Sequence, residues 1–315
     1  MTDQVAPPGV IASAPAMREL LAVVERLAAT RSAVLIEGES GTGKDLLAHW
    51  LHYQGPRRDG PLIKVHCPSI PDELLESELF GHERGAFTDA KQAKLGKLEL
   101  AAGGTLYFDQ IQDLSPALQA KLLRVVEERR FERLGGTRTI EVDVRFVSST
   151  NVDLRQAVAT SGFREDLYHR LSVVPLTVPP LRARREDILA LAELFLMRER
   201  QRGMTPASSF TPEAQQLLLG YLWPGNVREL KGAVERAALL APREQIGADA
   251  LPPQILEQPQ SLWAGRERKP TLRDIEQAYI RHILEHVGGS QTRAASVLGI
   301  SRKALWEKRR RYGIP

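Results

Sequence analysis

Gly38-Glu39-Ser40-Gly41-Thr42-Gly43-Lys44 is the stretch of this sequence that decides the fold. It follows an apolar run, Ala33–Ile36, and precedes a helical run, Asp45–His52, which is the strand–loop–helix context of a P-loop. The glycines let backbone N–H groups surround phosphates, the helix N-terminus favours their charge, and Lys44 reaches the β and γ oxygens. The motif normally continues with Ser or Thr for magnesium, and here Asp45 takes that place. We therefore expect residues 38–45 to bind ATP.

Short apolar runs on either side of this loop predict a buried sheet. They lie at Ala33–Ile36, Leu62–Val65, Thr105–Phe108, Val144–Val147 and Val173–Leu176. Helical segments lie between most of them, including Asp45–His52, Ala117–Glu128 and Leu154–Val158, and another, Ala16–Ala29, precedes them. Strands that alternate with helices predict an α/β fold with a parallel sheet covered on both faces.

After Pro179-Pro180 the strand signals stop and the sequence becomes helical. The helical segments are Glu186–Arg200, Pro212–Tyr221 and Asn226–Leu240, and they predict a small all-α lid. A Pro-rich stretch then precedes a last helical unit. The expected organisation is a disordered lead-in (1–12), an α/β subdomain (13–180), a helical lid subdomain (181–245), a linker (246–270) and a small all-α domain (271–315).

An acidic residue that ends a neighbouring strand is the second part of a phosphate site. Thr105-Leu106-Tyr107-Phe108-Asp109-Gln110 supplies it, because the Asp109 carboxylate can hold magnesium directly or through water. The next position normally carries a Glu that activates the attacking water. Gln110 can orient a water molecule but cannot take its proton, and losing a general base costs on the order of a hundred- to ten-thousandfold in rate. ATP hydrolysis is therefore uncertain.

Two further polar sets have both a functional and a structural interpretation. Ser149-Thr150-Asn151 follows a predicted strand, so Asn151 either senses the γ-phosphate or belongs to a helix cap before Leu154. Arg164 and Arg170 lie six residues apart before the last strand. They either make surface ion pairs or are offered to the nucleotide of a neighbouring subunit, where arginines contribute about a thousandfold in rate.

The C-terminal segment has the pattern of a helix-turn-helix. Ser290–Ser301 reads as a short helix, a turn containing Gly299 and a new helix start, with Ser301 as N-cap of a helix over Arg302–Tyr312. The second helix is expected to enter the major groove of DNA. The predicted small core consists of Ala294, Ala295, Val297, Leu298, Ile300 and Leu305.

The contacts of this segment with DNA can be assigned by charge and position. Arg302 and Lys303, near the helix start, are candidates for base contacts, and Lys308, Arg309 and Arg310 are candidates for phosphate contacts. Arg293 and Ser301 complete the predicted DNA-binding set. Trp306 is either a DNA contact or part of the core, and we favour the core. The helix Leu272–Val287 resembles a dimerisation element, and a dimer would suit palindromic half-sites.

Charge and composition agree with a cytoplasmic protein that binds a polyanion at one end. Residues 266–315 carry 12 Lys and Arg against 5 Asp and Glu, whereas residues 1–265 carry 31 against 34. No apolar run approaches the roughly 20 residues of a membrane span, and no signal peptide is evident. The one cysteine, Cys67, is either a nucleophile beside His66 or, as we favour, a small buried hydrophobe on a strand.

At this point the chain resembles the AAA+ activators of the alternative sigma factor sigma-54, the bacterial enhancer-binding proteins, with a Fis-like tail. The resemblance covers about residues 10–250 and rests above all on Glu78–Ala90, which is similar to the family's GAFTGA loop. It implies that the loop contacts sigma-54, and its residues are Gly85, Ala86, Phe87, Thr88, Asp89 and Ala90. Trp223–Leu230 resembles the family's sensor II, which implies that Arg228 contacts the γ-phosphate. The resemblance also implies hexameric rings in which Arg164 and Arg170 act as arginine fingers.

Three residues depart from the family pattern. Gln110 replaces the catalytic Glu, Asp89 replaces the second Gly of the loop motif, and His66 stands where the family usually has Asn. Together, Gln110 and His66 indicate a retuned or weakened ATPase. Family members often carry a receiver or sensory domain ahead of the ATPase, and the first dozen residues leave no room for one. Regulation by a partner protein, by expression level or by a paralogous second subunit is therefore expected.

These observations support two functional hypotheses. In the first, the chain binds upstream DNA, forms an ATP-bound ring with magnesium as cofactor, and remodels sigma-54 RNA polymerase to activate transcription. In the second, it binds ATP but barely hydrolyses it, and acts as a repressor or within a mixed ring whose active partner supplies the missing base. A third, an AAA+ remodeller unrelated to sigma factors, does not explain residues 78–90.

Overall fold

The computed structural model describes residues 10–69, 71–88, 90–241, 244–256, 271–286 and 290–314. The chain forms two compact units, one of Met1–Arg202 with Trp223–Glu235 and one of Gly203–Leu222 with Arg236–Pro315. These units do not coincide with the predicted subdomains, whose boundaries stay a prediction. No helix in the described part of the chain is long and apolar enough to cross a membrane.

A five-stranded sheet forms the centre of the first unit, in the order β2-β5-β8-β1-β9. Its strands are β1 (Val34–Glu37), β2 (Leu62–His66), β5 (Thr105–Asp109), β8 (Arg145–Thr150) and β9 (Val174–Thr177). All four pairings are parallel, with Val34 of β1 opposite Val147 of β8 and Val174 of β9. The predicted α/β fold with a parallel sheet is therefore confirmed, and each predicted strand lies within a few residues of an observed one.

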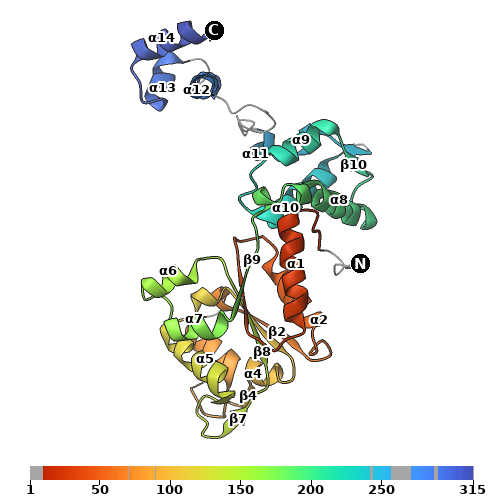
Figure 1. The fold of residues 1–315 in the computed structure, drawn as a ribbon, viewed down its shortest axis with the longest axis vertical. Helices are drawn as coiled ribbons and strands as arrows, with labels where there is room; N and C mark the ends of the chain where they lie inside the picture. Colours follow the sequence, from red (N-terminus) through yellow and green to blue (C-terminus); the bar gives the residue numbers. More distant parts are fainter. Residues whose placement is uncertain are drawn as a thin grey trace. The chain divides into compact units, whose positions relative to one another are not determined.

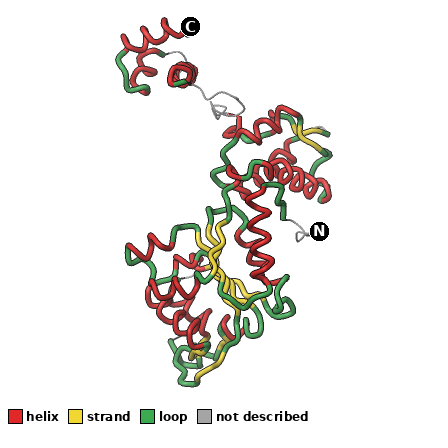
Figure 2. Tube along the Cα trace, viewed as in Figure 1, coloured by secondary structure: helices red, strands yellow, loops and turns green. Residues whose placement is uncertain are grey.

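Helices cover both faces of this sheet (Figures 1 and 2). They are α1 (Pro15–Ala28), α2 (Lys44–Tyr53), α3 (Asp72–Phe80), α4 (Lys97–Leu100), α5 (Pro116–Glu128), α6 (Leu154–Ala159) and α7 (Glu165–Leu171). The helix α8 (Glu186–Gln201) belongs to the same unit but does not cover the sheet. Pro15 and Pro116 stand in the first turn of their helices, where a missing N–H costs nothing. Short 3-10 turns follow three strands: η1 (Cys67–Ser69), η2 (Ile111–Asp113) and η3 (Leu181–Ala183).

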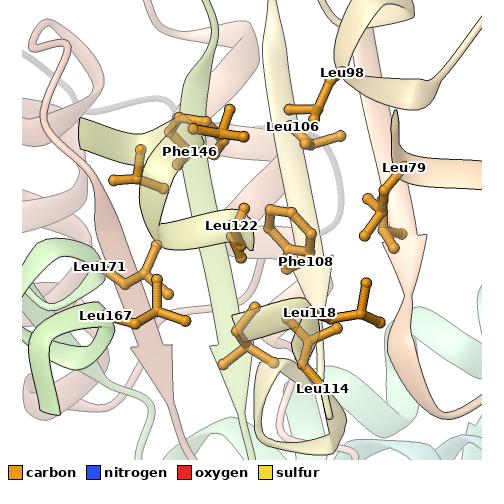
Figure 3. Close-up of a cluster of buried hydrophobic side chains, with 14 of the residues drawn as sticks. Leu79, Leu98, Leu106, Phe108, Leu114, Leu118, Leu122, Phe146, Leu167 and Leu171 are labelled. Atoms are coloured by element: carbon orange, nitrogen blue, oxygen red, sulfur yellow. The ribbon is translucent and has the colours of Figure 1, made fainter. Parts of the chain in front are cut away.

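The alternation of side chains along the strands builds two separate cores. On β5, Leu106 and Phe108 point to one face and Tyr107 to the other. The first face packs on α5 and α7, as the close-up in Figure 3 shows. The opposite face packs on α1 and α2. Because both faces are buried, the strands read as continuous apolar runs rather than as alternating ones.

Two antiparallel hairpins are inserted around the sheet. One pairs β3 (Gly81–His82) with β4 (Lys94–Leu95), and the other pairs β6 (Arg130–Glu132) with β7 (Thr139–Glu141). A bridge between His82 and Leu134 brings the two hairpins together. The sequence had no strand signal for either hairpin, because strands of two or three residues are too short to show a period.

The second unit contains short elements and the C-terminal helices. The elements are β10 (Ser209–Phe210), α9 (Pro212–Gly220), β11 (Gln245–Ile246), η4 (Ala248–Ala250), α11 (Pro253–Leu256), α12 (Leu272–His286), α13 (Gln291–Val297) and α14 (Arg302–Tyr312). The helix α10 (Asn226–Leu240) contributes its first part to the first unit and its last part to the second. The predicted helical segments of the lid and of the C-terminal unit are thus observed as helices.

Residues 246–256 of the expected linker form short elements, β11, η4 and α11. Ile246, Leu251 and Ile255 are buried, because these apolar side chains sit among the prolines and pack on neighbouring elements. The rest of the expected linker, 257–270, lies outside the described residues. The same holds for 1–9 of the lead-in, while Val10 is buried against the core formed with α1 and α2.

The C-terminal helices form the expected small core. Ile280, Ile283 and Leu284 of α12 pack with Ala294, Ala295, Leu305 and Ile314, and with the partly buried Leu298 and Ile300. The predicted core position Val297 is wrong, because its side chain is 55% exposed. Cys67 is buried as favoured, although on η1 directly after β2 rather than on the strand. Burial raises the pKa of its thiol to about 12, which leaves no thiolate for nucleophilic chemistry.

Candidate nucleotide-binding site

The P-loop connects β1 to α2 at the carboxyl edge of the sheet. Gly41 and Gly43 have φ of 78° and 103°, which side chains with a Cβ rarely adopt. A Cβ on Gly41 would also lie 2.3 Å from the carbonyl oxygen of Gly225. Gly43 is the N-cap of α2, so the loop leads directly into the first turn of that helix. The local sequence therefore directs backbone N–H groups and the N-terminus of α2 to the same place. Both favour the negative charge of a phosphate group there.

A cavity of about 450 Å³ lies against this loop, within the first unit. Side chains far apart in sequence line it, and the predicted set among them is Lys44, Asp45, Asp109, Gln110, Asn151 and Arg228. Apolar side chains line another part, including Val10, Met17 and Phe195. The volume and the mixture of a charged and an apolar lining suit a nucleotide. Ser40, Gly41, Thr42 and Gly43 of the predicted set also line this cavity, whereas Gly38 and Glu39 do not.

Lys44 is the most buried cation of the loop, with 8% of its surface exposed. Its Nζ donates to the carbonyl oxygens of Gly38 at 2.6 Å and Glu39 at 3.0 Å. Burial lowers its pKa. Since backbone carbonyls are weaker partners than phosphate oxygens, this ammonium gains from a bound phosphate.

Asp109, at the end of β5, accepts hydrogen bonds from several directions. Lys64 Nζ lies 2.9 Å from its Oδ2, His66 Nδ1 lies 3.0 Å from the same atom, and Ser149 Oγ donates to Oδ1 at 2.8 Å. Burial alone would raise the pKa of Asp109, but the hydrogen bonds from Lys64 and Ser149 outweigh it and the pKa is lowered. The carboxylate therefore stays ionised, as a magnesium ligand must be.

Asp45 shares Lys64 with Asp109. Its Oδ2 lies 2.6 Å from Lys64 Nζ, and its Oδ1 accepts from the Tyr107 hydroxyl at 2.6 Å. The side chain that replaces the usual Ser or Thr is thus held in a polar network beside the cavity. In the described part of the chain, no group of three or more His, Cys, Asp or Glu side chains could hold a metal ion. A magnesium ion here would need phosphate oxygens to complete its ligands.

Gln110 follows Asp109 with an unusual backbone. Its φ and ψ are both 61°, in the left-handed region, and its N–H donates to Ser149 Oγ at 3.2 Å. Non-glycine residues in this region are uncommon and occur often at functional sites. The side chain lines the cavity beside Lys44 and Asn151. An amide therefore occupies the place where a general base is needed.

Asn151 does not cap the following helix, so that structural alternative was wrong. Asp153 is the N-cap of α6, and its side chain accepts from Arg155 N–H at 2.9 Å. Asn151 lines the cavity instead, and its Oδ1 accepts from Gln112 Nε2 at 2.8 Å. This contact leaves the amide NH₂ of Asn151 as the donor available to a phosphate. The sequence had no signal for Gln112, which looks like any polar residue of a turn.

The start of α10 is tied to the P-loop. Arg228 Nη1 donates to Ser40 Oγ at 2.8 Å, and the Val227 N–H donates to the Gly41 carbonyl at 3.0 Å. Asn226 is fully buried, accepts from Leu181 N–H at 2.8 Å, and donates to the Ser40 carbonyl at 3.0 Å. Its φ of 53° is one that Asn tolerates better than most residues.

Glu39 of the loop joins this network through Arg182. The guanidinium donates twice to the carboxylate, at 2.7 and 2.5 Å, and Asn226 donates a third time at 3.1 Å. The hydrogen bonds from Arg182 and Asn226 lower the pKa of Glu39 to about 2. Nearby, Arg184 donates to the Thr42 carbonyl at 2.7 Å. Sequence reasoning missed Arg182 and Arg184, because isolated arginines after a proline pair carry no motif.

Arg164 and Arg170 do not line this cavity. Arg164 pairs with Asp166 at 2.8 Å, and Arg170 pairs with Glu127 at 2.8 Å. All four side chains are at least 38% exposed. Within one chain these arginines therefore make surface ion pairs, which is the structural alternative of the prediction, and their role as arginine fingers stays a prediction.

The loop around Phe87, which the family resemblance assigns to contact with sigma-54, is called the Phe87 loop below. It forms a compact turn beside the β6–β7 hairpin. The Gly85 N–H donates to the Ala90 carbonyl at 2.8 Å, and the Ala90 N–H donates to the Phe87 carbonyl at 3.0 Å. The Phe87 ring is 41% exposed and meets the edge of His82 at a centroid distance of 4.9 Å. Asp89 lies outside the described residues. A partly exposed phenylalanine at a turn is a suitable contact for another protein.

The predicted DNA-binding side chains lie on the C-terminal helices. Ser301 caps α14 by accepting from the Ala304 N–H at 3.1 Å, as predicted. Arg293, Arg302, Lys303 and Arg310 are exposed, whereas Lys308 and Arg309 are partly buried. Lys308 is also paired with Glu276 of α12. The favoured core position of Trp306 is wrong, because the ring is 53% exposed and Leu305 fills the core in its place.

Comparison with known proteins matches almost the whole chain to three domain families. A Sigma-54 interaction domain matches residues 10–177, an AAA+ ATPase lid domain matches 182–267, and a bacterial regulatory protein domain of the Fis family matches 271–312. The first of these alone covers more than half of the chain. The AAA+ match makes the chain a nucleotide-binding protein.

Curated proteins and solved structures agree with these matches. The transcriptional regulatory protein ZraR of Salmonella typhimurium is 46% identical over 300 residues, which cover 95% of this chain and 68% of ZraR. The regulatory protein AtoC of Escherichia coli is 44% identical over 312 residues, covering 97% and 68%. The crystal structure of NtrX from Brucella abortus in complex with ADP has a TM-score of 0.74 at 38% identity, covering 97% of this chain and 70% of that one.

A more distant structure bears on the fold alone. Hsp104 matches with a TM-score of 0.54 at 18% identity over 71% of this chain. The domain matches and the close relatives together decide the assignment: the chain belongs to the family of sigma-54-dependent transcriptional activators, with an AAA+ domain, its lid and a Fis-type helix-turn-helix.

Proposed function

We propose that the chain binds ATP with magnesium in the cavity at residues 38–45, assembles into a ring, and acts on sigma-54 RNA polymerase through the Phe87 loop. The Fis-type helices at 271–314 attach it to upstream DNA. The observation that supports this most is the convergence of Lys44, Asp109, Asn151 and Arg228 on one cavity. These side chains come from four separate parts of the chain, and each suits a nucleotide phosphate or its metal.

The site residues take distinct roles in this proposal. Lys44 and the backbone of Gly38–Gly43 hold the phosphates, and Arg228 and Asn151 contact the γ-phosphate. Asp109 would hold magnesium, which neutralises phosphate charge when bound. Arg164 and Arg170 would exchange their ion pairs for the nucleotide of the adjacent subunit in a ring.

The residues expected beside the γ-phosphate of ATP favour a second function. Gln110 lines the cavity where a carboxylate is needed, and His66 is bound to Asp109. A chain that binds ATP but hydrolyses it slowly would work as a repressor or beside a paralogous subunit that supplies the base. ATP-dependent sigma-54 transcription by the purified chain separates the two functions, because only an autonomous activator supports it alone.

Removing the Lys44 ammonium should weaken ATP binding. A charge-assisted hydrogen bond contributes about 1.5–3 kcal/mol, so Lys44→Ala is expected to raise the Kd for ATP roughly ten- to a hundredfold. Titration with a fluorescent ATP analogue in the presence of magnesium measures this. Lys91→Ala, at an exposed position away from the cavity, should leave the Kd unchanged. Equal affinities of the Lys44 variant and the unaltered chain would place the nucleotide elsewhere.

Truncating Phe87 should separate nucleotide binding from contact with sigma-54. Phe87→Ala leaves the cavity untouched, so its Kd for ATP should equal that of the unaltered chain. Binding of sigma-54 in the presence of an ATP transition-state analogue should fall at least tenfold, because central aromatic contacts carry about 2 kcal/mol or more. Leu95→Ala, which removes an exposed apolar side chain on β4, is the matched control. Unchanged sigma-54 binding by Phe87→Ala would contradict the proposed role of the loop.

A further inference from the structure

Trp306 is a large apolar side chain in an unexpected place. It lies on α14 of the second unit, directly after Leu305, which is fully buried in the small core. One residue along a helix is a rotation of about 100°, so a side chain next to a core residue turns away from the core. With 53% of its surface exposed, Trp306 contributes little to the packing of this unit. Tryptophan is enriched among the side chains that contribute most to binding at interfaces.

The residues around Trp306 form one face of α14. Helix geometry places Lys303, Trp306, Glu307 and Arg310 together, three or four residues apart, on a face turned away from Leu305. All four are exposed. The Arg310 guanidinium lies 5.7 Å from the centroid of the Trp306 ring, which is a cation–π contact. The ring and the cation therefore form a single feature on this exposed face.

We propose that Trp306 determines part of the DNA sequence preference of this chain, by packing its ring against a thymine methyl group in the major groove. The inference rests on the DNA binding proposed above. A neutral ring gains nothing from phosphates, and the C5 methyl of thymine is the apolar group that the major groove displays. Arg310, stacked on the ring, contacts the DNA backbone. Trp306 thus reads a base, whereas Arg310 positions the helix.

The ring has a second conceivable role, which the same experiment separates from the first. It could serve only to orient Arg310 towards a phosphate. In that case its loss would weaken binding to every DNA sequence alike and would make no difference between thymine and uracil. A base-reading ring distinguishes these two bases, because uracil differs from thymine only by the missing methyl group.

The experiment uses the full chain and a duplex that this chain selects from a random-sequence library. Each thymine of that duplex is replaced in turn by uracil, and dissociation constants are measured at several salt concentrations. For the unaltered chain, uracil at one position in each half-site should weaken binding about fourfold, the effect of one buried methyl group. Trp306→Ala should abolish this penalty and keep the salt dependence, since no charge is lost. Trp306→Phe should retain part of the penalty.

Arg310→Ala is the matched control on the same face. It should keep the uracil penalty, weaken binding to all duplexes alike, and reduce the slope of log K against log salt by about one. A uracil penalty that persists unchanged in Trp306→Ala would overturn the inference. If the unaltered chain binds no duplex at all, the proposed DNA binding fails, and the role of Trp306 fails with it.

Discussion

Replacing Gln110 by glutamate should make this chain hydrolyse ATP roughly a hundred- to ten-thousandfold faster. The side chain at this position lines the cavity beside Lys44 and Asn151, at the end of the strand that carries Asp109. A carboxylate there can take a proton from the attacking water, and an amide cannot. Phosphate release with excess ATP and magnesium measures the effect, and the Kd for ATP should change little because the phosphate-binding groups are intact.

Two comparisons make this result interpretable. Gln156→Glu makes the same chemical change on the exposed surface of α6, and it should not alter turnover. His66→Asn alters the second departure from the family, next to Asp109. If the unaltered chain turns over ATP as fast as the Gln110→Glu variant, another group activates the water. Loss of that turnover in His66→Asn would then show that it depends on His66.

Replacing Arg145 by methionine should destabilise the first unit by about 2–6 kcal/mol, because two buried carbonyls would each lose their partner at a cost of about 1–3 kcal/mol. Arg145 begins β8 and is 2% exposed. Its guanidinium donates to the carbonyls of Ala28 and Leu51 at 3.1 and 3.0 Å, and to that of Leu27 at 2.8 Å. These carbonyls belong to the last turns of α1 and α2, where carbonyls lack partners within the helix. The Leu27 carbonyl also accepts from the Thr30 N–H and from Thr30 Oγ1, both at 2.9 Å, so the Ala28 and Leu51 carbonyls depend most on Arg145. One cation therefore satisfies the ends of two helices.

Burial lowers the pKa of Arg145 to about 10, so the side chain is still charged at neutral pH. Chemical unfolding followed by circular dichroism should show an earlier transition for Arg145→Met. Arg18→Met, on the exposed face of α1, should change stability by about 0.5 kcal/mol or less. A loss below about 1 kcal/mol for Arg145→Met would mean that water satisfies the Ala28 and Leu51 carbonyls in place of the guanidinium.

Local patterns in the sequence were sufficient for the main elements of the fold. The P-loop glycines, the buried strands and the helix caps depend on the conformations of neighbouring residues, so short stretches predicted them. The strands were found because both faces of a parallel sheet are buried, which leaves continuous apolar runs. The family motifs Glu78–Ala90 and Trp223–Leu230 are also local. These motifs predict contact with sigma-54 and with the nucleotide without any knowledge of the tertiary structure.

Contacts between distant residues were decided only by the tertiary structure. Lys64 and His66 lie far from Asp109 in sequence, yet β2 and β5 pair in register, with His66 opposite Asp109. Arg182 reaches Glu39 across 143 residues, and Arg145 reaches two helix ends through the sheet. A single arginine or histidine has no periodicity, so the sequence alone cannot say what it meets.

The same reason explains the two core predictions that failed in the C-terminal helices. Val297 and Trp306 are apolar, and composition alone favours burial of both. The core of this unit is small, and Leu305 together with the alanines of α13 fills it. Which apolar side chains are left outside depends on how three helices pack. The sequence by itself thus determined the helices and strands, the phosphate loop and the family of this protein. The packing of the chain determined which polar side chains meet in the nucleotide site and that the Trp306 ring is exposed.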